Sequence, residues 1–219
     1  MILVNFKIYS ETFGNSAVRL AKIVKEVGDK YKIRTIVTAS ALDALRISRE
    51  TGVEVWLQNI DEYSDGKHSG FISAKQAFAL DIKGSLLNHS EHSVPKGTVL
   101  KIIKNKPPGF TLCCCVKSPN QAEKWVIKAK PDYVLLEPPE LIASETESVA
   151  TKNPHSIQKL ATLCQGLSLI VGAGVKNRED VKISLKMGAK AVMLSSAFVL
   201  SDDPQAVLSD IASGFSAII

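Results

Sequence analysis

The sequence has few of the features that mark secreted, membrane or disulfide-bonded proteins. Of its 219 residues only four are cysteines, and three of these, Cys113, Cys114 and Cys115, are consecutive. Neighbouring residues of a strand point to opposite faces, so this run suits neither a shared metal site nor a disulfide framework. No apolar run approaches the length that a bilayer requires, and the N-terminus lacks the pattern of a signal peptide. We therefore expect a cytoplasmic protein with reduced thiols and no membrane association.

The sequence also has no large excess of positive or negative charge. The 27 basic and 22 acidic residues leave a formal net charge of +5, spread along the chain rather than gathered in a stripe. Such a surplus helps to attract a small anion, but it is too dilute for a nucleic-acid-binding surface. The sequence also lacks a linker or a low-complexity segment. We therefore predict one domain, residues 1–219, that binds a small molecule and no nucleic acid.

Apolar runs recur eight times along the chain, separated by segments with helical patterns. Their apolar residues are consecutive rather than alternating, as in strands that are covered on both faces. The expected strands are residues 2–6, 33–38, 53–58, 84–87, 110–115, 132–137, 167–172 and 189–195. Eight strands that alternate with helices predict a parallel sheet closed into a compact (β/α)8 barrel. An open doubly wound sheet is the structural alternative.

Many of the expected helices begin with a residue whose side chain can cap the first turn. The cap candidates are Asn15, Ser40, Ser73, Ser118, Asn153, Asn177 and Asp203. In three cases a proline follows directly, at the first helical position, where its missing N–H costs nothing.

The active site of a (β/α)8 barrel lies at the carboxyl ends of its strands. Glu137 ends the sixth strand among apolar neighbours, a setting that suits a general base. His89 follows the fourth strand, where the start of a helix disfavours its charged form and suits a neutral donor. Lys7 ends the first strand, and Asn5 shares its face. Taken singly, these side chains also have ordinary interpretations as a solvated glutamate, a backbone-bonded histidine and a surface lysine.

The seventh and eighth strands end in small residues. Gly172-Ala173-Gly174 follows the seventh strand, and Ser195-Ser196 ends the eighth. The loops after these two strands are the usual phosphate seat of such barrels, with backbone N–H groups as donors. The sequence thus predicts a base, a neutral electrophile, a fixed cation and a phosphate seat at one rim.

Four motifs stand in order at the expected strand ends: Asn5-Phe6-Lys7, Asn88-His89-Ser90-Glu91, Glu137-Pro138-Pro139-Glu140-Leu141-Ile142 and Gly172-Ala173-Gly174. With these motifs the chain resembles, nearly end to end, the triosephosphate isomerase family in its shorter archaeal type. The resemblance implies interconversion of dihydroxyacetone phosphate and glyceraldehyde 3-phosphate through an enediolate, without metal or cofactor. It implies three catalytic residues and one auxiliary residue: Glu137 as the base, His89 polarising the carbonyl, Lys7 binding substrate, and Glu91 beside Lys7.

The resemblance also implies a loop, residues 138–150, that closes over the phosphate. The substrate-binding residues would be Asn5, Lys7, Ile142, Ala143, Gly172, Ala173, Gly174, Ser195 and Ser196. The family usually has Ile-Gly-x-Gly in this loop, where this chain has Ile142-Ala143-Ser144-Glu145, and Ser195-Ser196-Ala197 lacks the usual glycine.

The long loop 59–70 resembles the family loop that inserts into a partner subunit, which implies a homodimer at minimum; the ordinary interpretation is a mobile surface loop. Two other functions stay open: a different phosphate-binding barrel enzyme, and a non-catalytic barrel that binds a phosphorylated metabolite.

Overall fold

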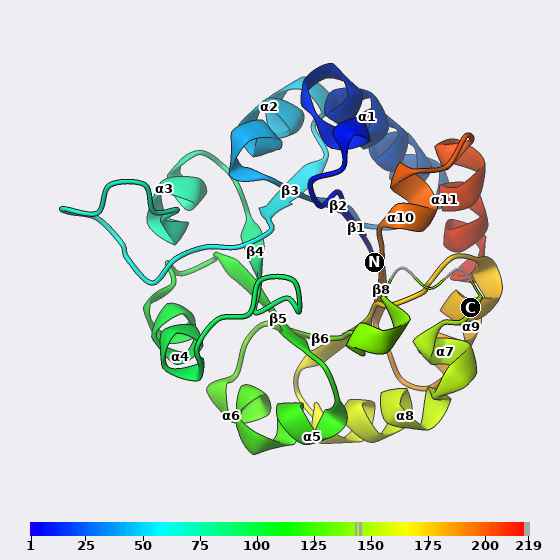
Figure 1. The fold of residues 1–219 in the computed structure, drawn as a ribbon. Helices are drawn as coiled ribbons and strands as arrows, with labels where there is room; N and C mark the ends of the chain where they lie inside the picture. The colour runs from blue at the N-terminus through cyan, green and yellow to red at the C-terminus, as the bar shows by residue number, and fades with distance from the viewer. Residues whose placement is uncertain (143, 145, 217–219) are drawn as a thin grey trace.

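The computed structural model describes residues 1–142, 144 and 146–216, and eight strands in this part of the chain close into one barrel (Figure 1). All neighbouring strands are parallel, they follow one another in chain order, and the last pairs with the first. The strands are β1 (Ile2–Asn5), β2 (Thr35–Ala39), β3 (Glu54–Leu57), β4 (Gly84–Leu87), β5 (Thr111–Val116), β6 (Tyr133–Leu136), β7 (Ser168–Val171) and β8 (Ala191–Leu194). The predicted (β/α)8 barrel is therefore confirmed, and the open sheet is excluded.

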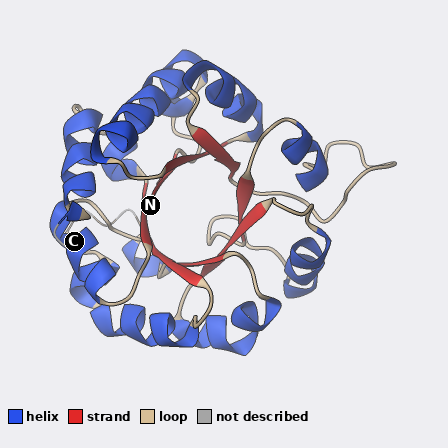
Figure 2. Cartoon of the chain, turned by 180° about the vertical axis from the view of Figure 1, so that it is seen from behind, coloured by secondary structure: helices blue, strands red, loops and turns tan. Residues whose placement is uncertain are grey.

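Helices surround the barrel on its outside, as Figure 2 shows from the opposite end. The α-helices are α1 (Gly14–Tyr31), α2 (Ala41–Thr51), α3 (Ala74–Ala79), α4 (Lys96–Asn105), α5 (Pro119–Gln121), α6 (Ile127–Ala129), α7 (Val149–Lys152), α8 (Pro154–Leu163), α9 (Arg178–Lys186), α10 (Ser196–Val199) and α11 (Pro204–Ser213). A π-helical segment, η2 (Ala122–Val126), joins α5 to α6, and short 3-10 turns occur at η1 (Ser10–Thr12) and η3 (Pro139–Leu141). Within the described residues, no helix has both the length and the apolar character to cross a membrane.

The strand residues alternate between two hydrophobic layers. One layer fills the barrel interior and includes Leu3, Ile36 and Trp56; the other packs between strands and helices. The cysteine run follows the expected alternation, because Cys113 and Cys115 belong to the interior while Cys114 packs toward the helices. A filled interior closes the barrel below its rim, so a ligand has access only to the strand ends.

Five of the predicted caps are confirmed, because their side chains accept a backbone N–H of the first turn: Ser73, Ser118, Asn153, Asn177 and Asp203. Two are wrong. Helix α1 begins at Gly14, and the Asn15 side chain accepts a hydrogen bond from Arg46 instead. Ser40 precedes α2 but makes no side-chain cap bond.

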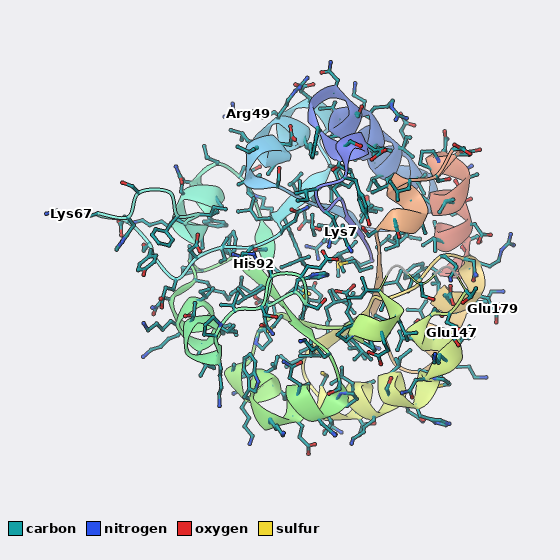
Figure 3. All side chains as sticks on the ribbon, in the orientation of Figure 1. Lys7, Arg49, Lys67, His92, Glu147 and Glu179 are labelled. Atoms are coloured by element: carbon teal, nitrogen blue, oxygen red, sulfur yellow. The ribbon has the colours of Figure 1, made fainter. Side chains whose placement is uncertain are left out.

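The segment between β3 and α3 leaves the barrel as a projecting loop (Figure 1), with Lys67 at its outer end (Figure 3). Its base is closed by two hydrogen bonds: Asp61 N–H donates to the Ile72 carbonyl at 2.9 Å, and Ile72 N–H donates to the Asp61 carboxylate at 2.7 Å. Between these ends, the Tyr63 ring stacks on His68 at 4.2 Å and meets Phe71 edge-on at 4.5 Å. The loop therefore has a shape of its own, although most of its residues are exposed.

Candidate active site

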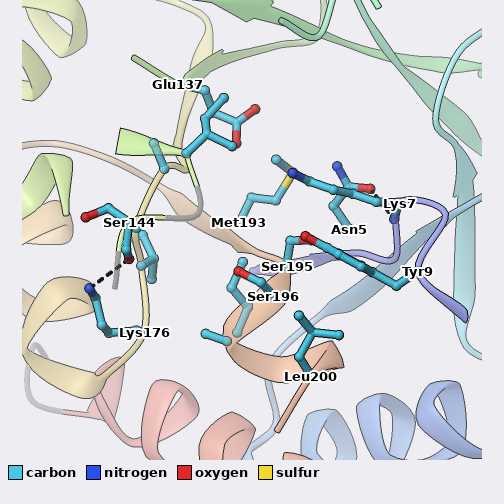
Figure 4. Close-up of a pocket in the computed structure, with 16 residues that line it drawn as sticks. Asn5, Lys7, Tyr9, Glu137, Ser144, Lys176, Met193, Ser195, Ser196 and Leu200 are labelled. Carbon is cyan, nitrogen blue, oxygen red and sulfur yellow. Dashed lines mark hydrogen bonds between the residues drawn. The ribbon is translucent and has the colours of Figure 1, made fainter. Parts of the chain in front are cut away.

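A cavity of about 490 Å³ opens at the carboxyl ends of the strands (Figure 4). Its lining includes eight of the residues that the sequence predicted for the site: Asn5, Lys7, Glu137, Ile142, Ala173, Gly174, Ser195 and Ser196. They come from the ends of β1, β6, β7 and β8 and from the loops that follow these strands. Segments from both halves of the chain thus meet around one space.

Lys7 is fixed at the rim by its backbone. Asn5 is buried at the end of β1, and its side-chain oxygen accepts the Lys7 N–H at 3.0 Å. Lys7 then adopts a left-handed backbone with φ of 50°, which lysine rarely does, and Gln58 donates to its carbonyl at 2.8 Å. The Lys7 ammonium lies 2.6 Å from a carboxylate oxygen of Glu91. Two side-chain hydrogen bonds to the Lys7 backbone and one ion pair therefore place this cation before any ligand arrives.

His89 is held by the turn that precedes it. Asn88 has a left-handed backbone, and its side chain bonds the Cys115 carbonyl and the Val94 N–H. The ring of His89 is buried, and its Nδ1 accepts the backbone N–H of Glu91 at 3.2 Å. A nitrogen that accepts a hydrogen bond carries no hydrogen, so in the neutral ring the hydrogen is on Nε2. His89 thus presents an N–H donor to the site.

The buried side chains of His89 and Glu137 face each other. The distance from His89 Nε2 to Glu137 Oε2 is 2.9 Å, yet neither atom makes an aligned hydrogen bond to any described residue. Burial and the Lys7 ammonium lower the pKa of His89, but the adjoining Glu137 carboxylate, with Glu91 behind it, raises that pKa more, so the net change is upward. The prediction that a helix start disfavours the charged form is wrong, because the next helix, α4, begins only at Lys96. Buried polar atoms without partners are uncommon and call for an explanation. A ligand that accepts from Nε2 and meets the carboxylate would satisfy both.

Glu137 is positioned from below by Gly172. A Cβ on this residue would lie 2.7 Å from Cγ of Glu137 and 2.8 Å from its Oε1. The backbone at Gly172 is not in the left-handed region, so space, not conformation, requires glycine here. Gly172 thus lies under the carboxylate, outside the cavity lining, where the sequence analysis had expected a substrate contact.

The far end of the cavity is built from small residues. Ala173 and Gly174 have left-handed backbones, with φ of 57° and 79°. A Cβ on Gly174 would clash with the Glu147 carbonyl, so the loops after β6 and β7 are in direct contact. Opposite them, the Ser195 hydroxyl is buried and makes no hydrogen bond within the described residues. This end can take a compact polar group with several acceptor oxygens.

Comparison with known proteins agrees with this geometry. The family model described as triosephosphate isomerase matches residues 1–214. The chain belongs to the triosephosphate isomerase family. Triosephosphate isomerase of Thermoplasma volcanium is 33% identical over 206 residues, covering 93% of this chain and 94% of that protein. The enzymes of Metallosphaera sedula and Saccharolobus solfataricus are 33% and 31% identical and cover 98% and 100% of this chain, and 95% and 97% of their own lengths.

Within this triosephosphate isomerase fold, the predicted residues take three kinds of position. Most line the cavity, while His89, Glu91 and Gly172 lie outside its lining and adjoin Glu137 or Lys7. Ala143 and Glu145, at the altered positions of the family loop, lie outside the described residues.

Other lining residues were not foreseen from the sequence: Tyr9, Ser144, Val175, Lys176, Met193, Leu194, Ala197 and Leu200. For most of them the sequence carried only a weak signal, nearness to a motif. Lys176 follows Gly174 by two residues, and Tyr9 follows Lys7 by two, but neither spacing identifies a side chain that reaches the cavity. Met193 sits two residues before Ser195 on β8, so its direction could have been read from strand alternation.

Proposed function

We propose that this chain interconverts dihydroxyacetone phosphate and D-glyceraldehyde 3-phosphate, with Glu137, His89 and Lys7 as catalytic residues. The observation that carries the proposal is the pair His89 Nε2 and Glu137 Oε2, buried, 2.9 Å apart and without aligned partners, beside a fixed ammonium. An enediolate reaction needs this combination, because one group must remove a carbon-bound proton while others stabilise charge on oxygen. Membership of the triosephosphate isomerase family supports it independently.

In the proposed reaction, the Glu137 carboxylate removes a proton from C1 of dihydroxyacetone phosphate. The C–H electron pair becomes the C1–C2 double bond of the enediolate, and the carbonyl π pair moves onto oxygen. Proton transfer between the two oxygens, followed by return of the Glu137 proton to C2, gives the aldehyde. No redox step or cofactor enters this balance.

His89 and Lys7 stabilise the charge that develops on oxygen. The Nε2 hydrogen of a neutral imidazole is a weaker acid than that of imidazolium, so it donates to the oxygen and still exchanges protons with it. The Lys7 ammonium, already paired with Glu91, attracts the anionic substrate without first having to be ordered. Asn5 sets the backbone on which this lysine stands.

Ala173, Gly174, Ser195 and Ser196 form the proposed phosphate seat, and Ile142 lines the cavity from the loop 138–150. Ala143, which lies outside the described residues, stays a proposed substrate contact from the family resemblance. Closure of this loop excludes water from the enediolate, which otherwise loses its phosphate by elimination. The replacements at Ala143, Glu145 and Ala197 leave the proposed catalytic side chains unchanged. Their expected effect is on affinity or on the rate of closure.

We further propose that the chain is one domain over residues 1–219, works as a homodimer or a higher homo-oligomer through the projecting loop, and is cytoplasmic. The preformed shape of the loop, with an exposed Phe71, supports a contact surface. Four buried free cysteines are in keeping with a reducing compartment.

The test is an assay that couples triose phosphate isomerisation to a dehydrogenase, applied to wild type, Glu137→Asp and Glu140→Asp. Shortening Glu137 moves the base away from the substrate carbon, so kcat should fall by about 100-fold or more. Binding of 2-phosphoglycolate should change little. Glu140 is exposed and lies three residues further along, which makes Glu140→Asp the matched control. A folded wild type without turnover would refute the proposal.

A further inference from the structure

Lys176 lines the cavity, yet none of the sequence motifs assigns it a role. Its ammonium donates to two backbone carbonyls of the loop after β6, at 3.2 Å from Ser144 O and 3.4 Å from Glu147 O. Figure 4 shows Lys176 under this loop, across the cavity from Lys7. The cavity is therefore flanked by a cation on each side, one at the His89–Glu137 end and one beside the phosphate seat.

The backbone of Lys176 is anchored independently of its side chain. Its N–H donates to the buried carboxylate of Asp180 at 3.0 Å, and the other oxygen of this carboxylate accepts the Ser148 hydroxyl. Close by, Val149 N–H donates to the Ala173 carbonyl at 3.2 Å. The base of the loop is thus fixed at Ser148 to α9 and at Val149 to the loop after β7. The Lys176 side chain extends this attachment to the carbonyl of Ser144, which lines the cavity, while Ser144 Oγ also accepts the N–H of Glu147 within the loop.

An ammonium suits both a loop clasp and a neighbouring anion. It carries three hydrogens and accepts none, so two carbonyls leave one hydrogen for a further acceptor. Hydrogen bonds from a charged donor are about twice as strong as neutral ones. A phosphate dianion in the seat attracts the Lys176 ammonium. The same ammonium holds the loop that covers the phosphate.

We propose that Lys176 is a positioning residue that clasps the loop at Ser144 and Glu147 over the phosphate end of the cavity, so that binding of a triose phosphate and closure of the loop favour each other. This inference rests on the proposed function for the identity of the ligand. Its mechanical part, the clasp, does not depend on any turnover.

The clasp is tested first without ligand, by hydrogen–deuterium exchange measured by NMR at the amides of Ser144 and Glu147, whose hydrogen bonds lie in the clasped part of the loop. Lys176→Met keeps the length of the stem and removes the donor and the charge. It should speed exchange of these amides by about tenfold, because a charged hydrogen bond no longer opposes opening. Lys176→Arg should restore most of the protection. The matched control is Lys152→Met, which removes a lysine that contacts the exposed Glu147 carboxylate outside the cavity.

The coupling is tested by calorimetric binding of 2-phosphoglycolate and by steady-state kinetics on the same three variants. Lys176→Met should weaken binding by about tenfold and raise KM more than it lowers kcat, with recovery in Lys176→Arg. A purely structural role would lower the folded fraction and leave KM unchanged. Lys176→Met with wild-type exchange and wild-type affinity would overturn the inference, as would Lys176→Arg behaving like Lys176→Met. If wild type failed to isomerise, the proposed function would fall while the exchange result still decided the clasp.

Discussion

At the scale of single residues, the position of Glu137 depends on the lack of a side chain at Gly172. Gly172→Ala adds a Cβ that meets Cγ and Oε1 of Glu137 at 2.7 and 2.8 Å. The carboxylate must shift by several tenths of an ångström, and we expect kcat/KM to fall by about 100-fold for such a misplacement. The free energy of unfolding should change by only about 1–3 kcal/mol. Coupled assays and urea unfolding measure the two effects separately.

The control is Gly97→Ala in α4, where a Cβ meets nothing within 4 Å. There the substitution should leave kcat/KM unchanged and slightly stabilise the helix. Equal activity losses in both variants would argue against steric positioning of Glu137.

The pKa of His89 depends on the neighbouring carboxylate of Glu137. Glu137→Gln should lower the pKa of His89 from above its ordinary value to below it, because burial then outweighs the remaining carboxylate of Glu91. NMR titration of the imidazole measures this shift, with Glu140→Gln as the control.

In wild type the raised pKa stabilises the fold fully below about pH 6.5, and this contribution is lost as the pH rises through the raised value. In urea unfolding, the stability difference between wild type and Glu137→Gln should therefore shrink as the pH rises above about 6.5. A difference that grows over this range would contradict the assignment.

Residue patterns predicted the polar side chains at strand ends but not how they meet. Glu137 and His89 follow apolar runs, which sequence reveals. The 2.9 Å approach of His89 to Glu137 depends on the left-handed turn at Asn88 and on the space above Gly172, which no local pattern encodes. Lys176 was not predicted for a related reason. A lysine in a loop is usually exposed to solvent, and its partners here are carbonyls of a different loop.

At the scale of elements, Asp180 joins α9 to α7 and to the loop after β7. Its two oxygens accept from Ser148 Oγ and Lys176 N–H, both donors, at a site that is almost fully buried. Asp180→Asn must turn an amide NH2 toward one of these donors. We expect a loss of about 1–3 kcal/mol in the free energy of unfolding and weaker binding of 2-phosphoglycolate.

Asp203→Asn is the control for this substitution, because aspartate and asparagine cap helices almost equally and Asp203 caps α11 from the surface. Its unfolding curve should overlay that of wild type. An Asp180→Asn protein as stable as wild type would mean that water or a rearranged Ser148 replaces the bond.

Helix starts show where sequence rules suffice for an element. Asn153 and Asp203 each precede a proline, which is disfavoured inside a helix but tolerated at its first position. The proline therefore fixes the helix start, and the residue before it is the cap. Asn15 and Ser40 lack such a proline; so do Ser73 and Asn177, which cap their helices all the same. At Asn15 a long-range partner, Arg46, takes the side-chain oxygen, and the helix begins one residue earlier.

At the scale of the whole molecule, the barrel was predictable because each strand is buried on both faces, which few architectures allow. Closure itself was not encoded in any one segment. It requires that β8 reach β1, with Ile2 opposite Val192 and Leu3 opposite Met193, a pairing that spans nearly the whole chain. Only the count of eight strands indicated it, since strand number, tilt and register are linked in a closed sheet.

The projecting loop makes the last prediction, about assembly. In sedimentation, the wild-type assembly should have a mass of at least about twice the 23.7 kDa of one chain, and replacing residues 63–70 with two glycines should give a monomer. The hydrogen bonds between Asp61 and Ile72 stay in this variant, so the base of the loop can still close and the barrel can fold. Urea unfolding at several protein concentrations separates the two species, because only a dimer gains stability with concentration. Lys190→Glu changes an exposed residue just before β8 and should remain dimeric. A wild type that sediments as a monomer, or a shortened variant that remains a dimer, would show that this loop does not join two copies of the chain.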